Sequence, residues 1–321
     1  MKRPATGFLK RPAFGGYPAE YLISRLKGRS QNFVSDWGPW LERPAGELVL
    51  SQKYASQLEG DALAVRTWQL NEYRWIYRQM SDGLRGVFAP YFFYTELKTL
   101  HTCLRFRSRE GMEEKIAGLL SKSLLSDSIA DILMMPEPLP IVLDALWRVL
   151  SAFMELGPLR ELFLAGGLKA VEESITDAFL EHAAASNIHS VMKSFFSYTV
   201  DAGNILAAGK QARWAGRGLR FIKGGGLKTK LLEDAAASRD IARLIKYARK
   251  LSGLKMEADV GGLQVLLLKG MLKLSAAMAR LSDIGFMLHY LLRCFAEAMN
   301  FEVIIHGETV GPGLLIEQLV L

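Results

Sequence analysis

Hydrophobic residues along most of the chain recur every three or four positions, which is the period of an amphipathic α-helix. In one segment, Leu168, Val171, Ile175, Phe179 and His182 follow this spacing, while the acidic residues between them lie largely off the stripe. The same pattern returns in most other parts of the chain. It predicts a succession of helices.

The breaks between these periodic segments carry helix-boundary signals. Ser128 is followed three residues later by Asp131, as in a capping box at the start of a helix. The run MMPEPLP then predicts a turn, and Pro140 can occupy the first turn of the next helix. Helices joined by short breaks are therefore expected.

Strand signals are scarce. The most β-like run, FEVIIHGE at residues 301–308, directly follows a segment with helical period, so we predict that this helix continues to about His306. The sequence as a whole predicts an all-α fold.

Two stretches of the chain resemble each other. YTVDAGNILAAGKQAR at 198–213 and CFAEAMNFEVIIHGET at 294–309 share an acid followed three residues later by an asparagine. The pairs are Asp201 with Asn204 and Glu297 with Asn300.

A weaker third copy, PYFFYTELKTLHTCLR at 90–105, is aligned with Glu96 at the asparagine position and Phe93 at the acid position. Three helical units of about 100 residues would fit both this spacing and a length beyond that of one ordinary domain. The predicted organisation comprises a flexible basic arm over 1–18 and helical repeats over 19–110, 111–215 and 216–321.

Composition narrows the class of protein. Half of the residues are hydrophobic and 23% are charged, which is typical of a folded chain, and the net charge of +7 favours anionic partners. The two cysteines, Cys103 and Cys294, lie in helical patterns and support neither a disulfide framework nor a zinc site, so a reducing, cytoplasmic setting is expected. The N-terminal stretch lacks the apolar core of a secretory signal. The most hydrophobic segments are interrupted by charges, Gly or Pro before they are long enough to span a bilayer.

Sequence signals for catalysis or cofactor binding are missing. The glycines Gly203 and Gly209 enclose five residues instead of the four of a phosphate loop, and Gln211 replaces the magnesium-binding Ser or Thr. The histidines form no HExxH pattern, and His182 and His189 are two helical turns apart, too far to share one metal ion. No GxSxG motif occurs. We therefore expect no cofactor, no metal and no catalytic residue.

Residues 209–230, GKQARWAGRGLRFIKGGGLKTK, form the strongest electrostatic feature, with seven cations and no acid. Trp214 and Phe221 alternate with the cations, as in proteins that bind single-stranded nucleic acid. The plainer interpretation is a solvated helix end and a glycine-rich turn whose two aromatic residues belong to the core. The candidate contacts to an anionic partner are Lys210, Arg213, Arg217, Arg220 and Lys223.

A polar spine of Glu297, Asn300, Glu302 and His306 runs through the apolar stretch before Gly307. Acid–base catalysis would need a second titratable group from elsewhere, and the sequence indicates none. Because Asp201 and Asn204 repeat the spacing, we expect these side chains to hydrogen-bond each other or cap backbone groups in a buried helix contact.

These residues resemble the C-subunit family of the archaeal and bacterial V/A-type ATP synthases, which also includes the d subunit of eukaryotic vacuolar ATPases. Tyr290, Glu297, Asn300 and the IIHG run at 304–307 stand as in that family's C-terminal motif. Further similar segments are ELKTLHTCLR (96–105), FFSYTVDAGNI (195–205), AEYLISRLKGRSQNF (19–33) and FIKGGGLKTKLL (221–232). The positions carried over as structural or interface residues are Lys98, Arg105, Asp201, Asn204, Tyr290, Glu297, Asn300, His306 and Gly307.

The resemblance implies a funnel of three similar helical domains with pseudo-threefold symmetry, seated on the cytoplasmic end of a membrane rotor ring. Its central cavity would receive the foot of the central stalk, and the protein would transmit torque for ion transport without hydrolysing ATP. The implied partners are the stalk proteins and the ring, membrane association would be peripheral and through the complex, and nucleic acid is not expected. The sequence does not choose between proton and sodium transport.

Two alternatives from other classes stay open. A basic helical scaffold would bind nucleic acid through residues 209–230, in a strongly salt-dependent manner. An enzyme of unknown type would need a deep cleft lined by converging titratable groups.

Overall fold

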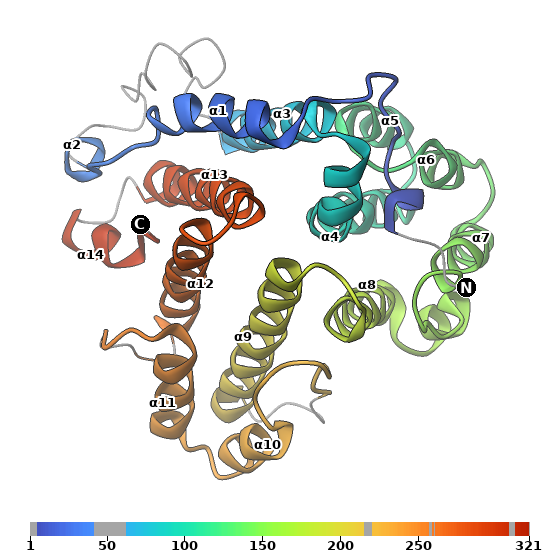
Figure 1. Ribbon diagram of the computed structural model, residues 1–321. Helices are drawn as coiled ribbons and strands as arrows, with labels where there is room; N and C mark the ends of the chain where they lie inside the picture. The colour runs from blue at the N-terminus through green and yellow to red at the C-terminus, as the bar shows by residue number, and fades with distance from the viewer. Residues whose placement is uncertain are drawn as a thin grey trace. The chain divides into compact units, whose positions relative to one another are not determined.

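The computed structural model describes residues 5–41, 62–214, 220–256, 259, 261–307 and 312–320. These residues form a helical protein without a β-strand (Figure 1), which confirms the predicted all-α class. The elements are η1 Ala5–Phe8, α1 Ala19–Ser30, α2 Gly38–Leu41, α3 Ala62–Gln79, α4 Asp82–Arg107, α5 Glu113–Lys122, α6 Asp127–Met134, α7 Leu139–Ser151, α8 Leu159–Ala185, α9 Ser190–Trp214, α10 Thr229–Ala237, α11 Ile241–Ser252, α12 Leu263–Ala279, α13 Asp283–His306 and α14 Pro312–Gln318.

The chain divides into two compact units. Unit 1 consists of Met1–Tyr17, Ile76–Val200 and Ile222–Gly224, and unit 2 of Pro18–Trp75, Asp201–Phe221 and Gly225–Leu321. The division falls within α3 and α9. It differs from the three segments predicted from the sequence repeat, whose boundaries stay a prediction.

Unit 1 is built around α4, which has no single apolar face because it is buried on most sides. Phe88, Phe92 and Phe93 of this helix are fully buried. The Phe93 ring lies 4.9 Å from that of Phe8 and 5.2 Å from that of Phe179 in α8, so aromatic contacts join η1, α4 and α8.

The segment predicted as part of a flexible arm is packed against unit 1 around Phe8 and Leu9. Phe8 and Leu9 are buried, Leu9 pairs with Leu125 in an antiparallel bridge, and the N–H of Lys10 donates to the carbonyl of Leu124 at 2.7 Å. The physical reason is that these two apolar side chains complete the aromatic core of unit 1. Residues 1–4 of the expected arm lie outside the described residues.

Unit 2 is built around α13, which packs against α12 and α1. Helix α11 packs on α12, and α14 contacts α13. The rings of Trp37 and Trp40 lie 5.1 and 5.3 Å from the ring of Phe301. The segment after α1 is thereby fixed to the C-terminal half of α13.

Several helix boundaries were predictable. Pro140 lies in the first turn of α7 and α13 ends at His306, as expected. The capping box at Ser128 is wrong, because α6 begins at Asp127 after Ser126, and Ser128 lies inside the helix with its hydroxyl 3.0 Å from that of Ser126. In α8, Val171, Ile175 and Phe179 are fully buried, which confirms the predicted stripe.

Candidate functional site

A buried carboxylate in α4 holds the segment that follows α5. Glu96 is 2% exposed; its Oε1 accepts the N–H of Leu124 at 2.7 Å and its Oε2 accepts the hydroxyl of Ser123 at 2.6 Å. Both carboxylate oxygens thus bind donors where α5 has ended. Hydrogen bonds to a charged group are stronger than neutral ones, so this contact fixes the α5 exit against α4.

Asp201 in α9 makes the corresponding contact in unit 2. Its Oδ2 accepts the N–H of Gly226 at 2.8 Å and its Oδ1 accepts the N–H of Leu227 at 3.0 Å, just before α10. Burial raises the pKa of this carboxyl above its ordinary value, and the two backbone donors oppose that shift without cancelling it.

Glu297 and Asn300 in α13 are both fully buried and both accept backbone N–H groups from segments distant in sequence. Glu297 Oε1 accepts from Val34 at 2.6 Å, and Asn300 Oδ1 accepts from Val320 at 2.8 Å. Of the two expected roles, capping of backbone groups is therefore observed. These two members of the polar spine are internal braces.

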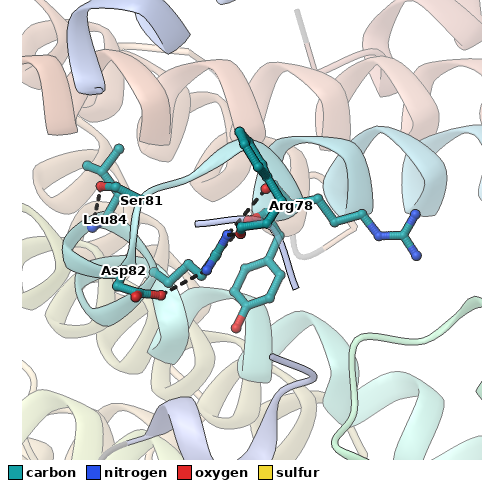
Figure 2. Close-up of polar contacts among 7 residues, drawn as sticks. Arg78, Ser81, Asp82 and Leu84 are labelled. Carbon is teal, nitrogen blue, oxygen red and sulfur yellow. Dashed lines mark hydrogen bonds and ion pairs between the residues drawn. The ribbon is translucent and has the colours of Figure 1, made fainter. Parts of the chain in front are cut away.

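The helix caps set the register of the repeat. Ser81 and Ser282 each cap a long helix, accepting from the N–H of Leu84 at 3.4 Å (Figure 2) and of Gly285 at 3.0 Å. Glu96 lies 15 residues after Ser81, and Glu297 lies 15 residues after Ser282. Glu96 thus corresponds to the acid Glu297, which corrects the alignment that placed Glu96 at the asparagine position.

The register correction also reassigns Phe93, which had been aligned with the acid. Its ring is fully buried and contacts other aromatic rings, so it belongs to the core. With this register, the acids of the three predicted copies are Glu96, Asp201 and Glu297.

The contacts of the three acids Glu96, Asp201 and Glu297, called the acid braces below, follow a cyclic order along the predicted segments. Glu96, late in 19–110, holds residues 123–124 of the next segment, and Asp201, late in 111–215, holds residues 226–227 of the last. Glu297, late in 216–321, holds Val34 of the first. Each acid therefore binds the early part of the following segment, and the third contact returns to the start.

Tyr290 belongs to a buried polar network in unit 2. The Tyr290 hydroxyl donates to Glu72 Oε1 at 2.7 Å. Arg29 donates its Nε to the same oxygen at 2.8 Å and its Nη2 to Glu72 Oε2. The Arg29 guanidinium also lies 4.3 Å from the centroid of the Trp75 ring. Burial, followed by the nearby Cys294 and Glu72, raises the pKa of Tyr290.

Sequence reasoning missed Glu72 and Arg29. A signal was present, because Glu72 interrupts the aromatic-rich run WQLNEYRWIY, but nothing in it indicated the partner 43 residues earlier.

Lys98 and Arg105 both lie on α4 with exposed side chains. Arg105 pairs with Glu172 of α8 through two bonds, Nε to Oε1 at 2.6 Å and Nη2 to Oε2 at 2.5 Å. The hydrogen bond to Glu172 raises the pKa of Arg105. Its side chain is 63% exposed, so solvent screens this ion pair and its contribution to stability is small.

The remaining motif residues, Asn204, His306 and Gly307, do not lie together in one site. Asn204 is buried in α9, whereas His306 is exposed at the end of α13. Gly307 is buried, and a Cβ there would lie 2.2 Å from Leu315 Cδ2 and 2.7 Å from the carbonyl oxygen of Val303. Glycine at this position permits the close approach of α14.

The end of α9 presents an exposed cationic face. Lys210, Arg213 and Trp214 are spaced by three and four residues and all three are exposed, Trp214 at 65%. The Arg213 guanidinium lies 5.2 Å from the centroid of the Trp214 ring. The interpretation that buries both aromatics of this segment is wrong for Trp214.

Three further candidate cations of this segment follow α9. Arg220 and Lys223 are exposed, and Arg217 lies outside the described residues.

The described residues bear on the requirements of a phosphate loop, an acid–base group and a metal site. Gly203 to Gly209 lie inside α9, so this stretch is a helix and no phosphate loop. Burial raises the pKa of Cys103 to about 12 and lowers that of His289 to about 4, so neither is poised for proton transfer near neutrality. Within the same residues, no three potential metal ligands cluster, and no helix has the length and apolarity needed to cross a bilayer.

The chain matches no protein-family model and no curated protein sequence.

Proposed function

We propose that this chain is a non-catalytic central-rotor subunit of a V/A-type rotary ATPase. It would link the central stalk to the membrane rotor ring and transmit torque for ion transport, on the cytoplasmic side of the membrane. The proposal rests on the ordered series of segments that resemble the C-subunit family of these ATPases, from residue 19 to residue 307. The three-lobed funnel with a central socket is part of the proposal.

The observation that carries the proposal is the cyclic order of the acid braces. Glu96, Asp201 and Glu297 each hold the beginning of the next predicted segment, and the last holds the first. Three equivalent units joined in this way would form a closed collar, which is the architecture a rotor adaptor requires.

The chemistry of the braces suits transmission of force better than catalysis. Each acid accepts at least one backbone N–H group. Asp201 uses both carboxylate oxygens for backbone N–H groups, and Glu96 uses one for an N–H and the other for the hydroxyl of Ser123. A carboxylate engaged like this stiffens a helix junction, most of all at Glu96, where the donors Ser123 and Leu124 are buried and losing their acceptor costs about 1 to 3 kcal/mol for each group. Torque needs such stiffness.

Affinity capture tests the proposal. The tagged chain is expressed in its native host, membranes are dissolved in mild detergent, and the co-purifying proteins are identified. We expect a hydrophobic ring protein and soluble stalk proteins in constant ratio to the bait. Recovery of the bait without them, from membranes whose ATPase is intact, would overturn it.

A second candidate function is supported by one observation, the exposed Trp214 beside Arg213. A basic scaffold would stack bases on this ring and bind phosphates through the neighbouring cations. A fluorescent single-stranded oligonucleotide should then bind with an affinity that falls steeply with salt, and Trp214→Ala with Arg213→Glu should abolish binding. Arg160→Glu, at an exposed arginine of α8, is the control, and a rotor adaptor should show no such binding.

A further inference from the structure

Unit 1 contains an open hollow of about 510 Å³ at the point where the N-terminal segment crosses the end of α3. This size is within the range of ligand-binding pockets. The lining residues are Pro12, Ala13, Phe14, Tyr17, Arg78 and Gln79.

A buried arginine fixes the walls of the hollow. Arg85 is 4% exposed, and its Nη2 donates to the carbonyl of Phe14 at 2.6 Å. The same guanidinium donates to the carbonyls of Tyr77 at 3.4 Å and Arg78 at 3.3 Å and to the carboxylate of Asp82 at 2.8 Å (Figure 2). One side chain therefore ties the N-terminal loop to the end of α3 and the start of α4.

A glycine allows the second wall to approach. Gly16 has φ +83°, and a Cβ at this position would lie 1.9 Å from the carbonyl oxygen of Met80. The next residue, Tyr17, donates its N–H to the carbonyl of Gln79 at 2.8 Å and pairs with Met80 in a parallel bridge. The loop is held in place at Phe14 and at Tyr17.

This rigid frame presents groups that contribute little to the core. Phe14 is 49% exposed, and its ring meets that of Tyr17 edge-on at 5.0 Å. Arg78 lines the hollow, and no acid among the described residues lies within ion-pair distance of its guanidinium. Figure 2 shows its side chain extending away from the Arg85 contacts. The nearby Asp82 is already bound by Arg85.

We propose that this hollow binds a segment of a partner protein that carries a carboxylate next to an apolar or aromatic side chain. The carboxylate would pair with Arg78 in the two-bond geometry that a guanidinium favours, and the apolar group would pack on Phe14 and Tyr17. Exposed aromatic and arginine side chains are typical centres of binding energy, and a fixed frame lowers the ordering cost of binding. Among the described lining residues Arg78 is the one cation, which matches a single carboxylate and is too few for a nucleic-acid backbone.

The smallest probe with both groups is N-acetyl-phenylalanine, and its amide is the uncharged match. Titration of the full-length chain, followed by NMR saturation transfer to the probe, should show saturable binding of the acid and binding of the amide weaker by about tenfold, the scale of a charge-assisted hydrogen bond. Arg78→Gln should remove this preference, and Phe14→Ala should weaken both probes.

Arg109→Gln, at another exposed arginine of unit 1, is the matched control and should change nothing. Circular dichroism checks that each variant is folded. Equal binding of the two probes, absence of saturable binding, or an acid preference that survives Arg78→Gln would overturn the proposal. So would tighter Arg78-dependent binding of an oligothymidylate, which would assign the hollow to phosphate. None of these outcomes depends on whether the chain co-purifies with a rotary ATPase.

Discussion

Glu297 accepts the backbone N–H of Val34 at 2.6 Å, although the two residues are 263 positions apart in the sequence. Glu297 is fully buried and Val34 is half-buried, so the contact lies at the edge of the core of unit 2. This contact joins the long helix α13 to the segment that follows the helix α1.

Glu297→Ala should lower the free energy of unfolding by about 1 to 3 kcal/mol, because the N–H of the half-buried Val34 loses its charged acceptor. Denaturation in urea, monitored by circular dichroism, measures the change. Glu302→Ala, half-buried on the same helix, is the control and should change it by less than about 0.5 kcal/mol. Equal losses in the two variants would show that the brace does not stabilise the fold.

The raised pKa of Asp201 predicts a pH-dependent contribution to stability. Because burial disfavours the ionised form in the folded state, the stabilising contribution is full below the ordinary pKa of 3.8 and is lost as the pH rises through the folded-state value. The free energy of unfolding of the natural chain should therefore fall relative to Asp201→Asn as the pH rises from about 3 to 7. If the free energy of unfolding of the natural chain instead rose relative to that of Asp201→Asn as the pH rises, the backbone donors would outweigh burial.

Gly307→Ala should destabilise the chain by about 1 to 3 kcal/mol, because the new Cβ would collide with Leu315 and with the carbonyl of Val303. Gly203→Ala is the matched control: it lies inside α9, where a Cβ would meet nothing within 4 Å. That variant should be neutral or more stable by up to about 1 kcal/mol, since alanine favours helix. Thermal melting of both variants decides between a packing requirement and a general intolerance of added methyl groups.

The contact between Tyr290 and Glu72 should show coupling in a double-mutant cycle. Tyr290→Phe and Glu72→Gln each remove part of the same 2.7 Å hydrogen bond, so their effects on the free energy of unfolding should fall short of additivity by about 1 kcal/mol. Fully additive effects would indicate that the tyrosine is held by packing alone.

Trp214→Ala should leave the free energy of unfolding within about 0.5 kcal/mol of the natural chain, because the ring is 65% exposed. Urea denaturation measures the difference. A loss comparable to that of a core aromatic would mean that the ring is buried in solution, and would remove it as a surface for an anionic partner.

The fold class followed from the sequence because periodicity is a local property. The stripe at Val171, Ile175 and Phe179 and the end of α13 at His306 needed no knowledge of distant residues. The packed N-terminal segment was missed because prolines and glycines are typical of loops, and nothing local shows that Phe8 completes the core around Phe93.

The acids of the braces could be predicted from the sequence, but their partners could not. The recurrence of acids at Asp201 and Glu297 pointed to a shared structural role, whereas their backbone partners lie 25 to 263 residues away and leave no local trace. The register of Glu96 was recoverable in principle, because the Ser-Asp pairs at 81–82 and 282–283 stand at matching distances before the two glutamates. The cationic face at Trp214 was visible as composition, but its exposure depends on how α9 packs.

The bond between Val34 and Glu297 also constrains when the protein can acquire its shape in the cell. Residues 18–75 of unit 2 leave the ribosome long before residues 225–321 exist, and at typical elongation rates the interval from Val34 to Glu297 lasts about 10 to 50 s. During that time the face of α1 that packs against α13 lacks its final partner. The nascent chain is therefore an expected client of chaperones that shield apolar helices until synthesis has passed α13.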